Sequence, residues 1–211
     1  MKCPVCRSIR IESFTTVGAI EYWKCSECSA ICVSPKQHLG PEDEADRYRL
    51  HQNCMDDAGY LRFLSTLAVP LLERLPAAQS GIDFGCGPGP ALAQMLREAG
   101  HSVALYDPMF FPDDSVLEAK YDFVTCTEVA EHFHSPAQSF ARLFGLLRPG
   151  GTLAVMTGFP PESAKFAGWH YRRDPTHVVF YAPETFHWLA WQYGAQCEIP
   201  CRNVALLLLP S

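Results

Sequence analysis

The spacing of apolar and polar residues predicts a chain in which helices and short strands alternate. Apolar residues recur at helical intervals from Tyr60 to Leu72, and the pair Ser135-Pro136 begins another helix with an apolar face. Short apolar runs predict strands at residues 82–84, 102–106, 122–126, 152–157, 196–199 and 203–209. This order of elements indicates an α/β fold whose last two strands pair as a hairpin.

Length and composition fit a globular protein. The 211 residues suffice for one α/β domain with a small appendage, and 48% of them are hydrophobic against 19% charged. The longest apolar run, Val204–Leu209, is shorter than the roughly 18 residues of a membrane helix, and Met1–Pro4 begins no apolar signal region. We therefore expect a cytoplasmic protein with no membrane contact.

Four of the ten cysteines form two CxxC pairs near the N-terminus. Cys3 and Cys6 are followed, after eighteen residues, by Cys25 and Cys28. This spacing is typical of a tetrahedral zinc site, and strands at residues 9–14 and 19–24 would complete a zinc ribbon over residues 1–35. Four thiolates leave no open coordination position, so the zinc is not catalytic. The zinc ion either stabilises the fold of the module or helps the module to recognise substrate.

Residues 36–78 are expected to form a linker followed by helices. The linker begins in a polar stretch that contains Gly40 and Pro41, and a charged helix is expected near residues 44–53. Tyr48 and His51 belong to this helix. They line either a lid over a bound cofactor or a solvated helix face.

A glycine-rich turn joins a buried strand to a helix at the start of the third region, residues 79–211. The turn reads Asp83-Phe-Gly85-Cys86-Gly87-Pro-Gly89, and Pro90 stands where a dinucleotide-binding GxGxxG motif would have its third glycine. Glycines allow a sharp turn and close approach of a ligand to the backbone. The pattern indicates a cofactor smaller than a dinucleotide.

An acidic residue, Asp107, ends the next strand about 20 residues past the glycine turn, where a carboxylate can accept hydrogen bonds from ribose hydroxyls. Because Pro108 follows it, Asp107 could also be a simple turn residue. The strand at Tyr121 begins only fourteen positions later, so the third strand and its helix must be shortened.

These motifs resemble those of class I S-adenosylmethionine (SAM)-dependent methyltransferases. The glycine turn is similar to motif I of that family, and the segment Leu-Leu-Arg148-Pro-Gly-Gly-Thr-Leu is similar to another of its segments. The resemblance implies a Rossmann-like sheet of strand order 3-2-1-4-5-7-6, with the zinc ribbon preceding it. It also implies SAM contacts from Asp83, Gly85, Cys86, Gly87, Gly89, Asp107, Pro108, Thr127 and Glu128.

Two segments are candidates for the chemistry. Glu128, Glu131 and His132 would share one face of a helix, and they resemble the ExxEH motif of ubiquinone-biosynthesis O-methyltransferases. That resemblance implies a second divalent metal, which would lower the pKa of a phenolic acceptor. Alternatively, the segment is a helix start that forms a wall of the cofactor site, with Glu128 and His132 as active-site residues.

The second candidate segment follows the fifth strand and is rich in aromatic and charged residues. It includes Trp169, Tyr171, Arg173 and His177, and such a loop is unusual as a plain connection. His177 is the candidate general base, unless it only anchors the loop by hydrogen bonding. Trp169 and Tyr171 would stack on a planar acceptor or pack against the protein.

The leading functional hypothesis is SAM-dependent methylation of a small planar acceptor at oxygen, nitrogen or sulfur. A net charge of −6 argues against DNA and makes RNA less favoured, since proteins that bind long nucleic acids usually carry a basic surface. RNA base methylation, with the zinc ribbon as recognition module, is the second hypothesis. A SAM-binding sensor without turnover is the third.

Overall fold

The computed structural model describes residues 1–49 and 57–211, apart from the side chain of Tyr48. The described residues form two compact units, each assembled from separate stretches of the chain. The first unit draws on Met1–His51, Glu128–Ala141 and Thr157–Leu189, and the second on Gln52–Thr127, Arg142–Met156 and Ala190–Ser211. These units interleave along the chain, so they do not test the contiguous boundaries predicted from the sequence. Those boundaries stay predictions.

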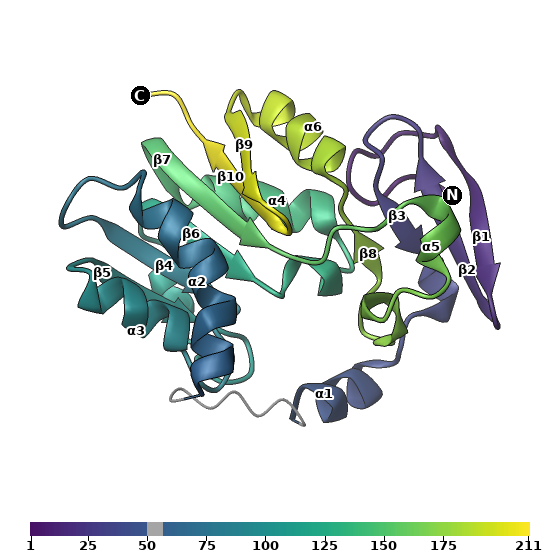
Figure 1. The fold of residues 1–211 in the computed structure, drawn as a ribbon, viewed down its shortest axis with the longest axis horizontal. Coiled ribbons are helices and arrows are strands. Elements are labelled where there is room, and N and C mark those ends of the chain that lie inside the picture. The colour runs from purple at the N-terminus through teal and green to yellow at the C-terminus, as the bar shows by residue number, and fades with distance from the viewer. Residues whose placement is uncertain (50–56) are drawn as a thin grey trace. The chain divides into compact units, whose positions relative to one another are not determined.

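The second unit is built on a six-stranded mixed sheet of order β5-β4-β6-β7-β10-β9 (Figure 1). Its strands are β4 (Ser80–Phe84), β5 (Ser102–Tyr106), β6 (Tyr121–Thr127), β7 (Leu147–Met156), β9 (Gln196–Cys201) and β10 (Val204–Leu208). The first four run parallel, whereas β10 pairs antiparallel with β7 and with β9. The predicted terminal hairpin and the order of these strands are confirmed.

The predicted shortening between Asp107 and Tyr121 is also confirmed. Within the described residues this stretch holds a single β-bridge, Asp107 to Phe111, and the 3-10 helix η2 (Asp114–Leu117). No separate third strand joins the sheet of the described chain, which leaves β5 at the edge. Fourteen positions are too few for a strand, a helix and their two connections.

Helices α2 (Ala58–Leu72) and α3 (Ala91–Glu98) pack on this sheet and form the core of the second unit. Leu64, Leu67 and Leu71 lie on the buried face of α2, as their helical spacing predicts. Close packing also demands glycine inside β4, since a Cβ at Gly81 would overlap the ring of the fully buried Phe123.

The first unit contains a four-stranded antiparallel sheet of order β1-β2-β3-β8. Strands β1 (Ile11–Val17) and β2 (Ile20–Cys25) turn at Gly18, whose φ of +62° favours glycine. Strand β3 (Ile31–Val33) pairs with β2 on one side and with β8 (Val179–Phe180) on the other. The N-terminal module therefore shares its sheet with residues almost 150 positions later in the chain.

Aromatic side chains fill the core of the first unit. Tyr22 packs edge to face on Phe166 with ring centroids 5.0 Å apart, and Phe166 contacts Phe180 in the same way at 5.8 Å. Trp169 and Tyr171 lie at the border of this cluster. The N-terminal strands and the segment around residues 163–180 thus have one common hydrophobic core.

The remaining elements connect these parts of the chain. They are η1 (Pro35–Gln37), α1 (Pro41–Arg49), η3 (Ala130–His132), α4 (Pro136–Gly145), α5 (Ser163–Phe166), η4 (Tyr171–Arg173) and α6 (Pro183–Tyr193). Helix α4 begins at the predicted Ser135-Pro136 pair and ends at Gly145. Among the described helices, none has the length and apolarity needed to cross a membrane.

Candidate functional site

The glycine turn lies between β4 and α3, as the sequence predicts. Gly85 and Gly87 have φ values of +77° and +63°, a conformation that side chains with a Cβ disfavour. The N–H groups of Gly85 and Cys86 donate to the carbonyl of Tyr106 at 2.7 and 3.2 Å, which joins the turn to the end of β5. The carbonyl of Gly89 accepts from the N–H of Ala91 at 2.8 Å as α3 begins.

Asp107 is held by the turn it faces. Its Oδ2 accepts from the N–H of Gly87 at 3.0 Å, and its Oδ1 accepts from the N–H groups of Met109 and Phe110 at 2.9 and 3.0 Å. Pro108 occupies the turn that brings these donors back to the carboxylate. A carboxylate has about four lone-pair sites, so with three donors bound Asp107 retains acceptor capacity for one further hydroxyl, such as one of a ribose.

Asp83 and Thr127 supply buried polar atoms at the same ends of β4 and β6. Thr125 donates its hydroxyl to Asp83 at 2.7 Å, and burial raises the pKa of Asp83 to about 6. The hydroxyl oxygen of Thr127 is buried without a hydrogen-bond partner in the described structure. Because buried polar atoms rarely lack a partner, this hydroxyl fits a polar ligand such as the SAM cofactor.

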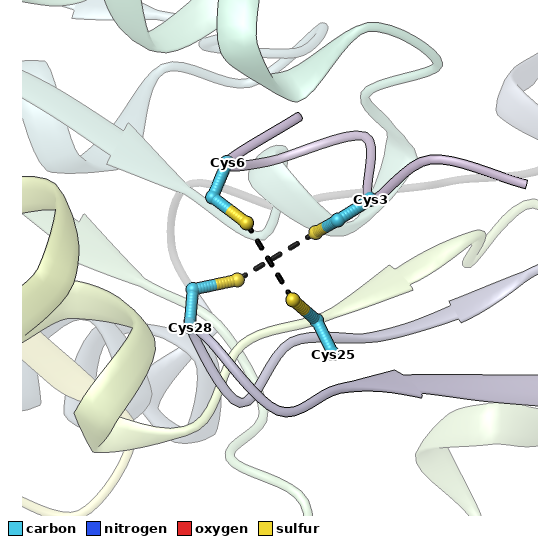
Figure 2. Close-up of side chains that lie close together, drawn as sticks. All are labelled: Cys3, Cys6, Cys25 and Cys28. Carbon is cyan, nitrogen blue, oxygen red and sulfur yellow. Dashed lines mark hydrogen bonds between the residues drawn. The ribbon is translucent and has the colours of Figure 1, made fainter. Parts of the chain in front are cut away.

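The four N-terminal cysteines converge, with their thiols facing a common centre (Figure 2). The Sγ atoms of Cys3 and Cys28 are 3.6 Å apart, and those of Cys6 and Cys25 are 3.5 Å apart. Sulfur atoms on a tetrahedral zinc lie about 3.8 Å apart when each Zn–S bond is about 2.3 Å. The cluster therefore has nearly the dimensions of a four-thiolate zinc site.

A second polar cluster lies in the first unit around Glu131, whose side chain is 0% exposed. Its Oε2 accepts from the hydroxyl of Thr157 at 2.8 Å, and its Oε1 accepts from the hydroxyl of Tyr171 at 2.5 Å. Burial raises the pKa of Glu131, while His177 and these two donors act in the opposite direction. Sequence analysis missed Thr157, although a polar residue at a strand end was the available signal.

His132 and His177 pack edge to face beside Glu131, with ring centroids 4.7 Å apart. The Nε2 atoms of His132 and His177 lie 3.9 and 4.0 Å from Glu131 Oε1. Burial lowers the pKa of His177, which favours the neutral imidazole. The structure thus brings His177 to His132 and Glu131, although 45 positions separate the two histidines in the chain.

The sequence analysis expected Glu128 to share a helical face with Glu131 and His132, and this expectation is wrong. Its φ is +53°, and only the single 3-10 turn η3 follows, so the i, i+3, i+4 geometry of an α-helix does not form. Burial and the nearby Glu131 raise the pKa of Glu128 to about 8, while Tyr171 opposes this shift. The ligand atoms that lie within 4.8 Å of one another belong to Glu131, His132 and His177.

The other predicted substrate residues differ in position. Trp169 stacks on Tyr171 with ring centroids 5.1 Å apart, and both are partly buried. Arg173 is exposed and donates to the carbonyl of Gly168 at 3.4 Å, so it points along its own loop. His51 and the side chain of Tyr48 lie outside the described part of the chain.

Comparison with known proteins agrees with this geometry. The family described as a methyltransferase domain matches residues 56–198, which is more than half of the chain. No curated protein matches the sequence closely enough to be informative.

Several solved structures are similar in fold. A Pyrococcus horikoshii protein has a TM-score of 0.56 at 16% identity, covering 79% of this chain and 99% of its own. A Burkholderia thailandensis 1,6-didemethyltoxoflavin N1-methyltransferase has a TM-score of 0.51 at 18% identity, covering 95% and 100%. Magnesium protoporphyrin IX methyltransferase from Synechocystis has a TM-score of 0.50 at 15% identity, covering 80% and 90%.

The glycine turn, Asp107 and the mixed sheet define a Rossmann-like methyltransferase fold. The chain belongs to the methyltransferase domain family and is a SAM-dependent methyltransferase. Strands β1, β2 and β3 and the four-cysteine cluster precede the matched residues 56–198, whereas β8 of the same sheet lies within them.

Proposed function

We propose that this enzyme methylates a small planar acceptor at oxygen, nitrogen or sulfur. The observation that carries the proposal is the cluster of Glu131, His132, Tyr171 and His177, bordered by the stacked Trp169. It places partly buried aromatic side chains beside groups that can accept a proton. Both segments that form it leave the sheet at the carboxyl ends of parallel strands, β6 and β7, where ligands bind in α/β folds.

Residues of the second unit would hold the cofactor. Asp107 would bind the ribose, the N–H groups and glycines of the turn at residues 85–89 would border the amino acid portion, and Asp83 and Thr127 would complete the polar wall. When bound, SAM supplies an electrophilic methyl group and is left as a neutral thioether. The protein then has mainly to align the acceptor and exclude water.

His177 is the proposed general base for a protonated acceptor. Its Nδ1 lies 2.7 Å from the carbonyl of Tyr171, so Nδ1 carries the hydrogen and Nε2 has the free lone pair. Burial keeps the imidazole neutral, which is the form that accepts a proton. His132 and Glu128 would orient the acceptor beside it.

Charge and resemblance favour a small acceptor. The net charge of −6 does not suit a polyanion, and the charges of the N-terminal 35 residues nearly cancel. Two proteins of similar fold are named for planar substrates, 1,6-didemethyltoxoflavin and magnesium protoporphyrin IX. RNA base methylation and SAM sensing without turnover remain as outcomes of the experiment below.

We also propose that the four-cysteine cluster binds one structural zinc ion. The distances between sulfurs fit four-thiolate coordination. Four thiolates would leave the zinc ion no coordination position for substrate. The ion would therefore affect catalysis only by stabilising the fold of the module.

Transfer of label from methyl-tritiated SAM into cell extract, fractionated into RNA, protein and small metabolites, tests the proposed acceptor class. We expect label in the metabolite fraction, with transfer strongly reduced in His177→Gln and unchanged in the exposed control His187→Gln. Label that ribonuclease removes would instead support the hypothesis of RNA base methylation. SAM binding without transfer to any fraction would favour the sensor.

A further inference from the structure

Two glutamates of the first unit bring their carboxyl groups to one phenolic hydroxyl. Tyr171 donates this hydroxyl to Oε1 of the fully buried Glu131 at 2.5 Å. Glu128, which is partly buried, interacts with the same hydroxyl, and it lies close enough to Glu131 for the charge of that carboxylate to raise its pKa. The acceptor cluster of the proposed function therefore contains a pair of neighbouring acidic groups.

The basic side chains of the same loop do not balance this pair. Arg172 donates to the carbonyl of Ala167 at 2.9 Å, and Arg173 donates to the carbonyl of Gly168 at 3.4 Å. In the described part of the chain, no lysine or arginine forms an ion pair with either glutamate. Buried carboxylates without a strong cationic partner are costly, so a bound cation would stabilise them.

The two histidines beside Glu131 are in a tautomer that can accept a proton from such a cation. The Nδ1 of His132 lies 3.1 Å from the carbonyl of Thr176, and the Nδ1 of His177 lies 2.7 Å from the carbonyl of Tyr171. A carbonyl only accepts, so each Nδ1 carries the hydrogen and each Nε2 has the lone pair. These Nε2 atoms lie 3.9 and 4.0 Å from Glu131 Oε1, so the carboxylate would stabilise an imidazolium formed there.

We infer that the methyl acceptor is a cationic nitrogen compound, a protonated amine or nitrogen heterocycle, whose positive charge pairs with Glu128 and Glu131. The inference rests on the proposed function and narrows its acceptor atom from oxygen, nitrogen or sulfur to nitrogen. An ammonium group donates charge-assisted hydrogen bonds to carboxylates and keeps them ionised. An acceptor oxygen or sulfur would instead develop negative charge beside two carboxylates, and repulsion between like charges opposes this.

The charges of the cluster stay compensated during the transfer. One proton of the ammonium group passes to Nε2 of His177, the proposed base, and later to solvent. The freed lone pair on nitrogen forms the new N–C bond, while the C–S bond of SAM breaks and its electron pair stays on sulfur. The positive charge that leaves sulfur therefore reappears on the methylated nitrogen, where Glu128 and Glu131 again balance it.

The chemical class of the labelled product tests the inference. The full-length enzyme transfers label from methyl-tritiated SAM to the small-metabolite fraction of cell extract, unreacted SAM is removed by chromatography, and the products are passed over a strong cation exchanger at acidic pH. We expect the exchanger to retain the label. With SAM that carries carbon-13 in its methyl group, the chemical shift of the transferred carbon should be that of an N-methyl group. Products that pass through the exchanger, or the shift of a methyl ether or thioether, would overturn the inference and leave the proposed function standing.

Glu128→Gln separates recognition of the acceptor's charge from binding of the cofactor, because it preserves the size of the side chain and removes its charge. We expect methyl transfer to the retained metabolites to fall at least roughly 10-fold, since a charge-assisted hydrogen bond becomes a neutral one. The dissociation constant for SAM should not change, which also shows that the variant is folded. Glu184→Gln, whose glutamate is exposed on α6, is the matched control and should alter neither quantity.

An unchanged transfer rate in Glu128→Gln, or a loss of SAM affinity equal to the loss of rate, would overturn the assigned role of this carboxylate. Label confined to RNA, or SAM binding without transfer to any fraction, would defeat the proposed function and this inference together. Only a neutral labelled metabolite defeats the inference alone.

Discussion

The backbone N–H of Val178 donates a hydrogen bond to the carbonyl of Glu131 at 2.9 Å. The carbonyl of Val178 accepts in turn from the N–H of Val33, also at 2.9 Å, and β3 pairs with β8 directly beyond this point. Val33 lies five residues after Cys28, and Val178 follows His177. One ladder of backbone hydrogen bonds therefore connects the four-cysteine module to both sides of the Glu131–His177 cluster.

Because of this connection, we expect loss of the proposed zinc to displace Glu131 and His177 and thereby to slow methyl transfer. In Cys25→Ser, we expect one metal equivalent less and a methyl-transfer rate at least roughly 10-fold lower, because small displacements of reacting groups are costly. The dissociation constant for SAM, measured by calorimetry, should change little, because the glycine turn and Asp107 belong to the other unit. Cys197→Ser is the matched control, and full activity after metal loss would contradict the prediction.

Substitution of Asp107 should remove SAM binding. Asp107→Ala loses a carboxylate proposed to accept a ribose hydroxyl and leaves the N–H groups of Gly87, Met109 and Phe110 without their acceptor. Hydrogen bonds to a charged group contribute about 1.5–3 kcal/mol each, so the affinity should fall by a factor of roughly 100 or more. Calorimetry with SAM tests this, with the exposed Glu98→Gln as control. Equal affinity in Asp107→Ala would refute the assigned cofactor site.

Asp83 should make the protein less stable as the pH rises from about 4 to about 6. Burial raises its pKa to about 6 in the folded protein, against an ordinary value of 3.8, so the folded state favours the protonated form. Its contribution is complete below the unfolded pKa, declines through this interval and is lost above it, by up to about 3 kcal/mol. Urea unfolding of Asp83→Asn should show a weaker decline over this range than the unaltered protein. Parallel pH profiles would contradict the assignment.

Gly158 should be intolerant of a side chain. A Cβ there would lie 2.7 Å from the ring of Tyr171 and push away the hydroxyl that binds Glu131. We expect Gly158→Ala to lower the methyl-transfer rate roughly 10-fold or more, with unchanged SAM affinity. Gly145→Ala is the control, because a Cβ at Gly145 meets no atom within 4 Å. Equal rates in the two variants would show that Tyr171 has no positioning role.

The local sequence was sufficient to predict those parts of the structure that depend on residues close together in the chain. The strand, glycine turn and helix around Gly85–Gly89 follow from steric freedom at glycine and from periodicity within about 20 residues. The cysteine spacing likewise predicted a cluster, because a CxxC pair brings its two thiols together within one turn.

Prediction failed where the backbone departs from the regular pattern. The i, i+3, i+4 spacing predicted that Glu128, Glu131 and His132 share one face of an α-helix. In the structure Glu128 has a left-handed backbone conformation, and η3 is too short to form such a face. Strand β8 has two residues, too few for any alternation to identify it.

The sequence by itself determined the methyltransferase class, the glycine turn followed by Asp107 and the four-cysteine cluster, because each depends on short-range spacing and residue chemistry. Only the tertiary structure decided that His177 meets Glu131 and His132, and that β3 pairs with β8 beside them. The physical reason is that these contacts join segments about 45 and 150 residues apart. Their register is set by packing around Phe166 and Phe180 and by backbone hydrogen bonding, neither of which is encoded in a local pattern.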